Sequence, residues 1–202
     1  MLALKLLLFI CCLTLTSCAT TPPKQLNNAC AIFNEKSDWY QAAYNSYKRW
    51  GVPINVLLAI MHQESKFIHD AKPPRQKLLW VIPWTRPSSA YGYAQVKDDT
   101  WDWYREKTGH TFADRDDFDD AIDFIGWYGT MSKKLAGVPL WNAREQYLAY
   151  HEGHGGYKRK TYRKKKWLMQ VADKVARNSW AYKKQLEKCE DDLDRGWSLW
   201  PF

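Results

Sequence analysis

The stretch from Gly51 to Phe67 constrains the fold more than any other part of the chain. Pro53 stands where a first helical turn accepts proline, because the N–H that proline lacks has no partner there in any case. A helix that is apolar on all sides is buried, so we expect this segment to run through the core. Its apolar residues are Ile54, Val56, Leu57, Leu58, Ile60 and Met61.

One carboxylate, Glu64, ends this apolar segment and is followed at once by Ser65. Desolvation disfavours the charged form of a carboxylate, so a glutamic acid held against apolar walls keeps its proton near neutral pH and can donate it. Cleavage of a glycosidic bond needs such a general acid. From these residues alone, the alternative is a glutamate that ends the helix and points into water.

The chain begins with the pattern of an export signal, in which Lys5 precedes an apolar stretch over residues 6–17. This stretch is too short to span a bilayer and has the length of the apolar region of a signal peptide. The segment Leu15-Thr-Ser-Cys18 resembles the bacterial lipobox, which implies a signal peptide over residues 1–17 and lipid on Cys18. An ordinary secretory signal is the alternative. Residues 18–37 are expected to form a flexible tether.

The lipobox implies a location outside the cytoplasm, with the chain held at a membrane by its lipid. Ala19 follows Cys18 and favours the periplasmic face of the outer membrane. Two cysteines, Cys30 and Cys189, remain beyond the signal, and in an oxidising compartment such a pair is expected to form a disulfide. A bridge across so long a loop stabilises the fold by about 4–5 kcal/mol in the chain-entropy account. No cysteine and histidine set has zinc spacing, so no metal and no cofactor are expected.

Residues 38–189 are predicted to form one domain that is all-α or nearly so, followed by an aromatic tail over residues 190–202. Residues 70–87 are rich in Pro and Trp and predict a long loop, and no β-hairpin is predicted. Apolar periodicity and end signals predict further helices over residues 39–50, 98–109, 114–137, 142–150 and 167–189. The 12 Trp and 12 Tyr residues favour a sugar-binding groove or a membrane interface over a core alone.

Three short segments carry the chemistry. The first is Glu64-Ser65, the second covers residues 88–96 with Gly92-Tyr-Ala-Gln95 at its centre, and the third covers residues 148–157 with Ala149-Tyr-His-Glu-Gly153. In this order they resemble the three motifs of the SLT-type lytic transglycosylases, which share a lysozyme-like helical domain and cut peptidoglycan. The resemblance covers about residues 40–186.

The resemblance implies that Glu64 is the catalytic residue, first as acid and then as base. It protonates the bond between MurNAc and GlcNAc, and the muramic 6-hydroxyl then closes onto C1 to give a 1,6-anhydro end. Gln95 would supply two donors and an acceptor to a sugar, and Tyr150 would hold Glu64 by a hydrogen bond. The substrate-binding residues expected on this basis are Ser65, Ser89, Tyr91, Gly92, Tyr93, Gln95, Tyr150 and His151.

The chain departs from the family pattern in three places. Tyr93-Ala94 replaces Leu-Met in the second motif, His151 replaces an Asn in the third, and residues 70–87 look like an insertion. Histidine titrates where the family has a neutral amide. Two alternatives therefore stay open beside the transglycosylase: a hydrolytic, lysozyme-type muramidase, and a peptidoglycan-binding lipoprotein without activity.

Other charged groups have simpler interpretations. His62 is two positions from Glu64 on a helix and should face elsewhere. The carboxylates between Asp116 and Asp120 fit a solvated helix start that the helix dipole favours. His151 and His154 do not have the spacing of a zinc-binding pair. With a net charge of +8 and a basic run at Lys158–Lys166, the exported chain is expected to contact anionic surfaces and not nucleic acid.

Overall fold

The central helix α4 (Ile54–Ser65) passes through the core of the protein. In the computed structural model, which describes residues 21–75, 77–78, 82–83 and 88–198, this helix packs against α3, α6, α7 and α8. The side chains of Val56, Leu57, Leu58 and Met61 have no exposed surface at all. Burial on every side is what an apolar circumference predicts, and it leaves Glu64 at the end of a helix that cannot shift without repacking the core.

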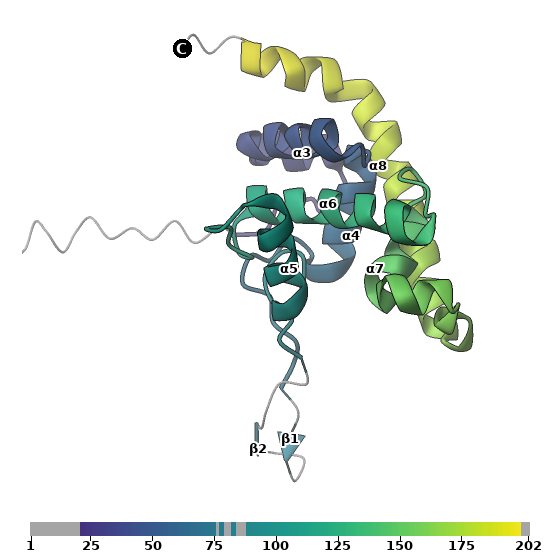
Figure 1. Cartoon of the computed structure of the whole chain (residues 1–202). Coiled ribbons are helices and arrows are strands. Elements are labelled where there is room, and N and C mark those ends of the chain that lie inside the picture. The colour runs from purple at the N-terminus through teal and green to yellow at the C-terminus, as the bar shows by residue number, and fades with distance from the viewer. Residues whose placement is uncertain (1–20, 76, 79–81, 84–87, 199–202) are drawn as a thin grey trace, which may run out of the picture.

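Helices make up most of the fold, which confirms the predicted all-α class (Figure 1). The other helices are α2 (Ala29–Glu35), α3 (Ser37–Trp50), α5 (Asp98–Thr108), α6 (Phe118–Ala136), α7 (Ala143–Lys158), the 3₁₀ helix η2 (Thr161–Lys164) and α8 (Lys166–Ser198). In Figure 1, α3, α4 and α6 lie at the centre and α8 runs along one side of the domain. None of the helices in the described part of the chain is long and apolar enough to span a membrane.

Glycines and polar caps set several of the helix ends as the sequence predicts. Gly51, Gly109 and Gly137 end α3, α5 and α6 in the left-handed conformation, with φ of 76°, 77° and 71°. Only glycine adopts this conformation at little cost, so it commonly terminates helices. At the other end of a helix, the Asn142 side chain accepts a hydrogen bond from the Glu145 amide at 3.2 Å and caps α7.

The segment over residues 70–87 contains a short antiparallel strand pair, β1 (Lys77–Leu78) and β2 (Ile82–Pro83), where a loop without a hairpin was predicted. Lys77 pairs with Pro83 and Leu78 with Ile82. The pair projects away from the helices in Figure 1. Two residues per strand are too few to show an alternating pattern, which explains why the sequence did not indicate them.

The prediction of a flexible tether as far as residue 37 is wrong for residues 29–37, because α2 and the start of α3 occupy them. Asn28 caps α2, and Ala29, Ile32 and Phe33 are buried with almost no exposed surface. This helix packs against α3 and α8. The predicted signal peptide and Cys18 lie outside the described residues.

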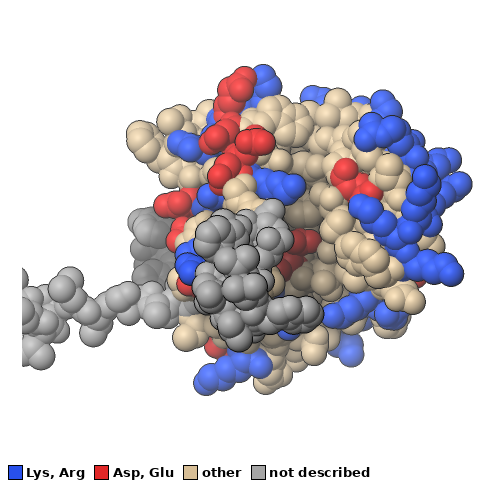
Figure 2. Space-filling view, turned by 90° about the horizontal axis from the view of Figure 1, so that it is seen from below, with Lys and Arg blue, Asp and Glu red and all other residues tan. Residues whose placement is uncertain are grey.

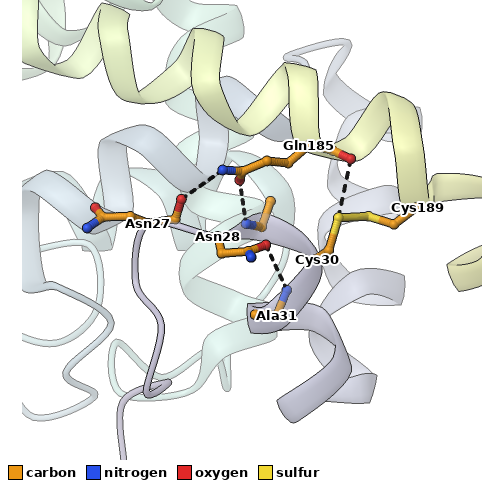
Figure 3. The surroundings of a disulfide bond; sticks show 7 residues. Asn27, Asn28, Cys30, Ala31, Gln185 and Cys189 are labelled. Carbon is orange, nitrogen blue, oxygen red and sulfur yellow. Dashed lines mark hydrogen bonds between the residues drawn. A yellow bond between two sulfur atoms is a disulfide. The ribbon is translucent and has the colours of Figure 1, made fainter.

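Cys30 and Cys189 form a disulfide that joins α2 to α8, with their Cα atoms 6.1 Å apart (Figure 3). The Gln185 side chain lies one turn before Cys189 and fastens the same region. Its Oε1 accepts from the Ala29 amide at 2.8 Å, and its Nε2 donates to the Asn27 carbonyl at 3.0 Å. The N-terminal segment is thus held to α8 by a covalent bond and by the hydrogen bonds of Gln185, and the Tyr182 hydroxyl of α8 also donates to the Leu26 carbonyl.

Helix α8 is longer than the predicted helix over residues 167–189, and it runs to Ser198 through most of the predicted tail. The Tyr40 hydroxyl donates to Asp194 Oδ1 at 2.6 Å, and Leu193 packs against the core. These contacts hold the additional turns against α3. Residues 199–202 lie outside the described part of the chain.

Candidate active site

Glu64 lies in the last turn of α4 and faces a cleft of about 400 Å³ between α4, α7 and the segment before α5. The three segments that the sequence singled out meet here, because residues of each line the cleft. The full lining is Glu64, Gln95, Val96, Lys97, Thr100, Tyr128, Tyr150, His151, Glu152 and Gly153. Figure 2 views the molecule of Figure 1 from below, and the face that it shows is hollowed near its centre.

The Glu64 carboxyl group is partly buried, and desolvation raises its pKa from 4.5 to about 7. A hydrogen bond from the Tyr147 hydroxyl acts in the opposite direction, since a donor favours the ionised carboxylate. Desolvation outweighs that bond. A carboxyl group with a pKa near 7 exists in both protonation states near neutral pH and can both give and take a proton.

Tyr147, and not Tyr150, holds Glu64. Tyr150 was predicted to bond the glutamate, but its hydroxyl donates to the Ala94 carbonyl at 2.6 Å and so ties α7 to the second segment. Tyr147 is one helical turn earlier on α7, so the two rings share a face of the helix. Sequence reasoning missed Tyr147, although its spacing of three residues from Tyr150 on a predicted helix was a usable signal.

Gln95 reaches the cleft with fewer free hydrogen-bonding groups than expected. Both Nε2 hydrogens are used, because this atom donates to the Ala71 carbonyl at 2.8 Å and to the Gly92 carbonyl at 3.0 Å. Only Oε1 is therefore left for a sugar. Gln95 has a positive φ of 47°, so the two bonds also fix a backbone conformation that non-glycine residues seldom adopt.

His151 and Glu152 line the cleft next to each other on α7. The ring nitrogen Nδ1 of His151 lies 3.2 Å from Glu152 Oε1, and Lys165 Nζ lies 2.6 Å from the same oxygen. The predicted helix end at residue 150 lies close to a kink in α7, beyond which a second helical piece continues to Lys158. Only Gly153 leaves the helical conformation, with φ 70° and ψ 160°.

Three predicted substrate residues have structural roles away from the cleft. Ser65 is buried and its hydroxyl donates to the Met61 carbonyl at 3.3 Å within α4. Ser89 Oγ accepts from the Asp98 amide at the start of α5. The Tyr91 hydroxyl donates to Asp116 Oδ2 at 2.8 Å.

Gly92 and Tyr93 belong to the core and do not line the cleft. Tyr93 is 1% exposed and its ring meets the rings of Trp39 and Phe118 edge-on at 5.7 Å. Gly92 has a φ of 75°, and a Cβ there would lie 2.0 Å from the Arg115 carbonyl oxygen. The second segment thus needs glycine to pack against the chain before α6.

The remaining charged candidates also lie away from the cleft. His62 Nδ1 is 2.6 Å from the Tyr182 hydroxyl, on the α8 side of α4, as its helical position predicted. Asp117 caps α6, and Asp119 and Asp120 lie in the first turn of this helix. His154 lies 3.1 Å from Ser132 Oγ and stacks on Tyr128, so it does not converge with His151. Among the described residues, no three His, Cys, Asp or Glu side chains are arranged to hold a metal ion.

A comparison with protein families matches residues 6–189 to the transglycosylase SLT domain. The chain belongs to the SLT-domain transglycosylases. This membership supports lytic transglycosylase activity in general and a peptidoglycan substrate for this SLT-domain protein. No curated protein and no solved structure matches the chain.

Proposed function

We propose that this SLT-domain protein is a lytic transglycosylase that cuts the β-1,4 bond between MurNAc and GlcNAc in peptidoglycan, with Glu64 as its acid and base. The position of Glu64 carries the proposal. Its carboxyl group faces the cleft at the end of a fixed core helix, its pKa is about 7, and Tyr147 orients it. A general acid must be protonated near the working pH and be held in place, and the raised pKa and the hydrogen bond from Tyr147 support this role for Glu64.

The reaction has two halves. Protonated Glu64 gives its proton to the glycosidic oxygen O4 of GlcNAc while the bond from that oxygen to C1 of MurNAc breaks, leaving oxocarbenium character at C1. The 6-hydroxyl oxygen of the same MurNAc then bonds to C1, and its proton returns to the Glu64 carboxylate. No water is consumed, the product carries a 1,6-anhydro ring, and the enzyme regains its starting protonation state.

The full-length wild-type protein and one variant, Glu64→Gln, test this reaction on purified sacculi, with the products read by mass spectrometry. The wild-type protein should release anhydro-muropeptides, and Glu64→Gln should release none while keeping its thermal melting curve. Reducing ends from the wild type would favour the lysozyme-type muramidase. A wild type that pellets with sacculi but releases nothing would favour the binding lipoprotein.

We also propose that lipid on Cys18 holds the protein to the periplasmic face of the outer membrane. Cys18→Ala should move the protein from the membrane fraction to the periplasmic fraction, whereas an ordinary secretory signal would leave its distribution unchanged. Density-gradient separation of the two membranes tests the outer-membrane assignment, which fails if the intact protein follows the inner membrane.

The basic run Lys158–Lys166 spans the end of α7, all of η2 and the start of α8. In Figure 2, Lys and Arg side chains gather along one edge of the face viewed. We propose that this run contacts anionic groups of the envelope. Reversing Lys160, Lys164 and Lys166 to Glu should weaken binding to sacculi in a salt-dependent way, and reversing Lys183 and Lys188, which lie farther along α8, should not. Lys165 stays unchanged because Glu152 needs it.

A further inference from the structure

Glu152 is a nearly buried carboxylate with a polar partner on each of its two oxygens. Its side chain is 4% exposed, and Lys165 Nζ and His151 Nδ1 lie 2.6 and 3.2 Å from its Oε1. The Thr161 hydroxyl donates to its other oxygen, Oε2. Desolvation alone would raise the pKa of Glu152, but the hydrogen bonds from Lys165, Thr161 and His151 outweigh it and lower this pKa. Glu152 is therefore an ionised, fixed acceptor.

The His151 ring is packed against two aromatic rings. Its side chain is one-third exposed, the Trp167 ring meets it edge-on at 5.2 Å, and the Tyr147 ring lies 6.5 Å away. An ionised carboxylate only accepts hydrogen bonds, so Nδ1 of His151 must be the donor to Glu152. In the neutral ring the proton then stays on Nδ1, and Nε2 carries the lone pair.

This arrangement provides the cleft with a proton acceptor separate from Glu64. His151 on α7 and Glu64 on α4 line the same cavity. An asparagine at position 151 could offer a hydrogen bond but could not take up a proton. The titratable groups that share the cleft or contact the ring are Glu64, Lys97, Tyr128, Tyr147, Tyr150 and Glu152, with Lys165 behind Glu152.

We propose that His151 is a second catalytic residue, which accepts the proton of the muramic 6-hydroxyl at Nε2, and that Glu152 is the positioning residue that presents this nitrogen. The inference rests on the proposed function. In place of the direct return to Glu64 described above, the proton of the 6-hydroxyl passes first to Nε2 as that oxygen bonds to C1, and it makes an imidazolium whose charge Glu152 compensates. That proton then moves through solvent in the cleft to the Glu64 carboxylate. The overall reaction and its proton balance are unchanged.

The decisive variant is His151→Asn, which keeps a polar group and removes the proton acceptor. General-base catalysis contributes about 10²–10⁴-fold, so kcat should fall by at least about 100-fold while binding to sacculi is retained. The acidic limb of the kcat/KM profile, which requires a neutral His151, should disappear. His154→Asn is the matched control from the same segment and should keep both kcat and the acidic limb. Added imidazole should restore activity to His151→Gly.

Glu152→Gln tests the positioning role, because the amide keeps the shape of the side chain without its charge. We expect kcat to fall about tenfold with little change in KM. Nitrogen-15 spectra of the imidazole in the resting wild-type protein should show the Nδ1–H tautomer, and Glu152→Gln should populate both tautomers. A wild-type ring protonated mainly on Nε2 would overturn the proposal without any activity measurement.

The outcomes separate this inference from the proposed function. An active wild type with a His151→Asn variant within about threefold of its kcat, and with an unchanged acidic limb, would overturn the role of His151 alone. A wild type that releases no anhydro product would overturn both.

Discussion

The hydroxyl of Tyr147 donates a hydrogen bond to the carboxyl group of Glu64 and so connects the middle of α7 to the end of α4. The two residues are distant in sequence, and Tyr147 lies just before the third segment, outside the motifs. The bond has two effects on the acid: it fixes the direction of the carboxyl group, and it partly offsets the desolvation that raises its pKa.

Tyr147→Phe should therefore raise the pKa of Glu64 above its present value of about 7. Because the protonated form is the acid, the alkaline limb of the activity profile should move to higher pH, by about one unit. Rates measured on sacculi across a pH series test this. Tyr150→Phe loses the bond to the Ala94 carbonyl instead and should leave the alkaline limb where it is.

Glu64→Gln should stabilise the protein at high pH. The folded state holds the Glu64 proton more tightly than the unfolded state, so the wild type loses stability as pH rises from 4.5 to about 7. The variant does not titrate, and its free energy of unfolding should exceed that of the wild type by up to about 3 kcal/mol above that range. Denaturant unfolding at pH 4 and pH 8 measures the difference. No gain at pH 8, or an equal gain at both values, would contradict the raised pKa; Glu106→Gln is the exposed control.

Loss of the disulfide should lower stability substantially. Cys30 and Cys189 are 159 residues apart. In the chain-entropy account, closing a loop of that length raises the free energy of unfolding by about 5 kcal/mol at most. Cys30→Ser with Cys189→Ser should lower the melting temperature and should no longer respond to reductant, whereas the wild type should respond. Two free thiols in denatured, unreduced protein would refute the bridge.

Gly92→Ala should be far more damaging than Gly109→Ala. Both glycines have φ near 76°, so the backbone strain of an alanine lowers the free energy of unfolding by about 1–2 kcal/mol at either position. At Gly109 the added Cβ meets nothing within 4 Å, but at Gly92 it would meet the Arg115 carbonyl at 2.0 Å. The difference between the melting temperatures of the two variants measures the steric cost at position 92. Equal losses of melting temperature would mean that the second segment can move away from the Arg115 carbonyl.

The sequence predicted what depends on local pattern. The core helix followed from an apolar circumference, and the ends of α3, α5 and α6 followed from glycine and charge. The helix end predicted at residue 150 lies close to the kink at Gly153, but the sequence did not predict that the helix resumes after it, because a run of glycines normally breaks a helix. Gly155 and Gly156 instead remain helical, and only Gly153 departs.

The details of the cleft depend on tertiary contacts that a motif does not contain. Tyr93 and Tyr150 are both motif tyrosines, yet the first fills a space beside Trp39 and only the second reaches the cleft. Likewise, Glu152 acquires its partners from η2 and from Lys165, which come after a turn whose direction the residues do not reveal. Glu64, Gln95, Tyr150 and His151 were correctly brought together.

The covalent bond between Cys30 and Cys189 also determines how the protein responds to force. When tension is applied between the segment before Cys30 and the end of α8, the load crosses from one sulfur to the other and bypasses the 158 intervening residues. Glu64, Tyr147 and His151 all lie within this closed loop. Tension applied through the segment before Cys30 and through α8 beyond Cys189 would therefore act on those two parts of the chain, and the cleft within the closed loop would keep its shape under load.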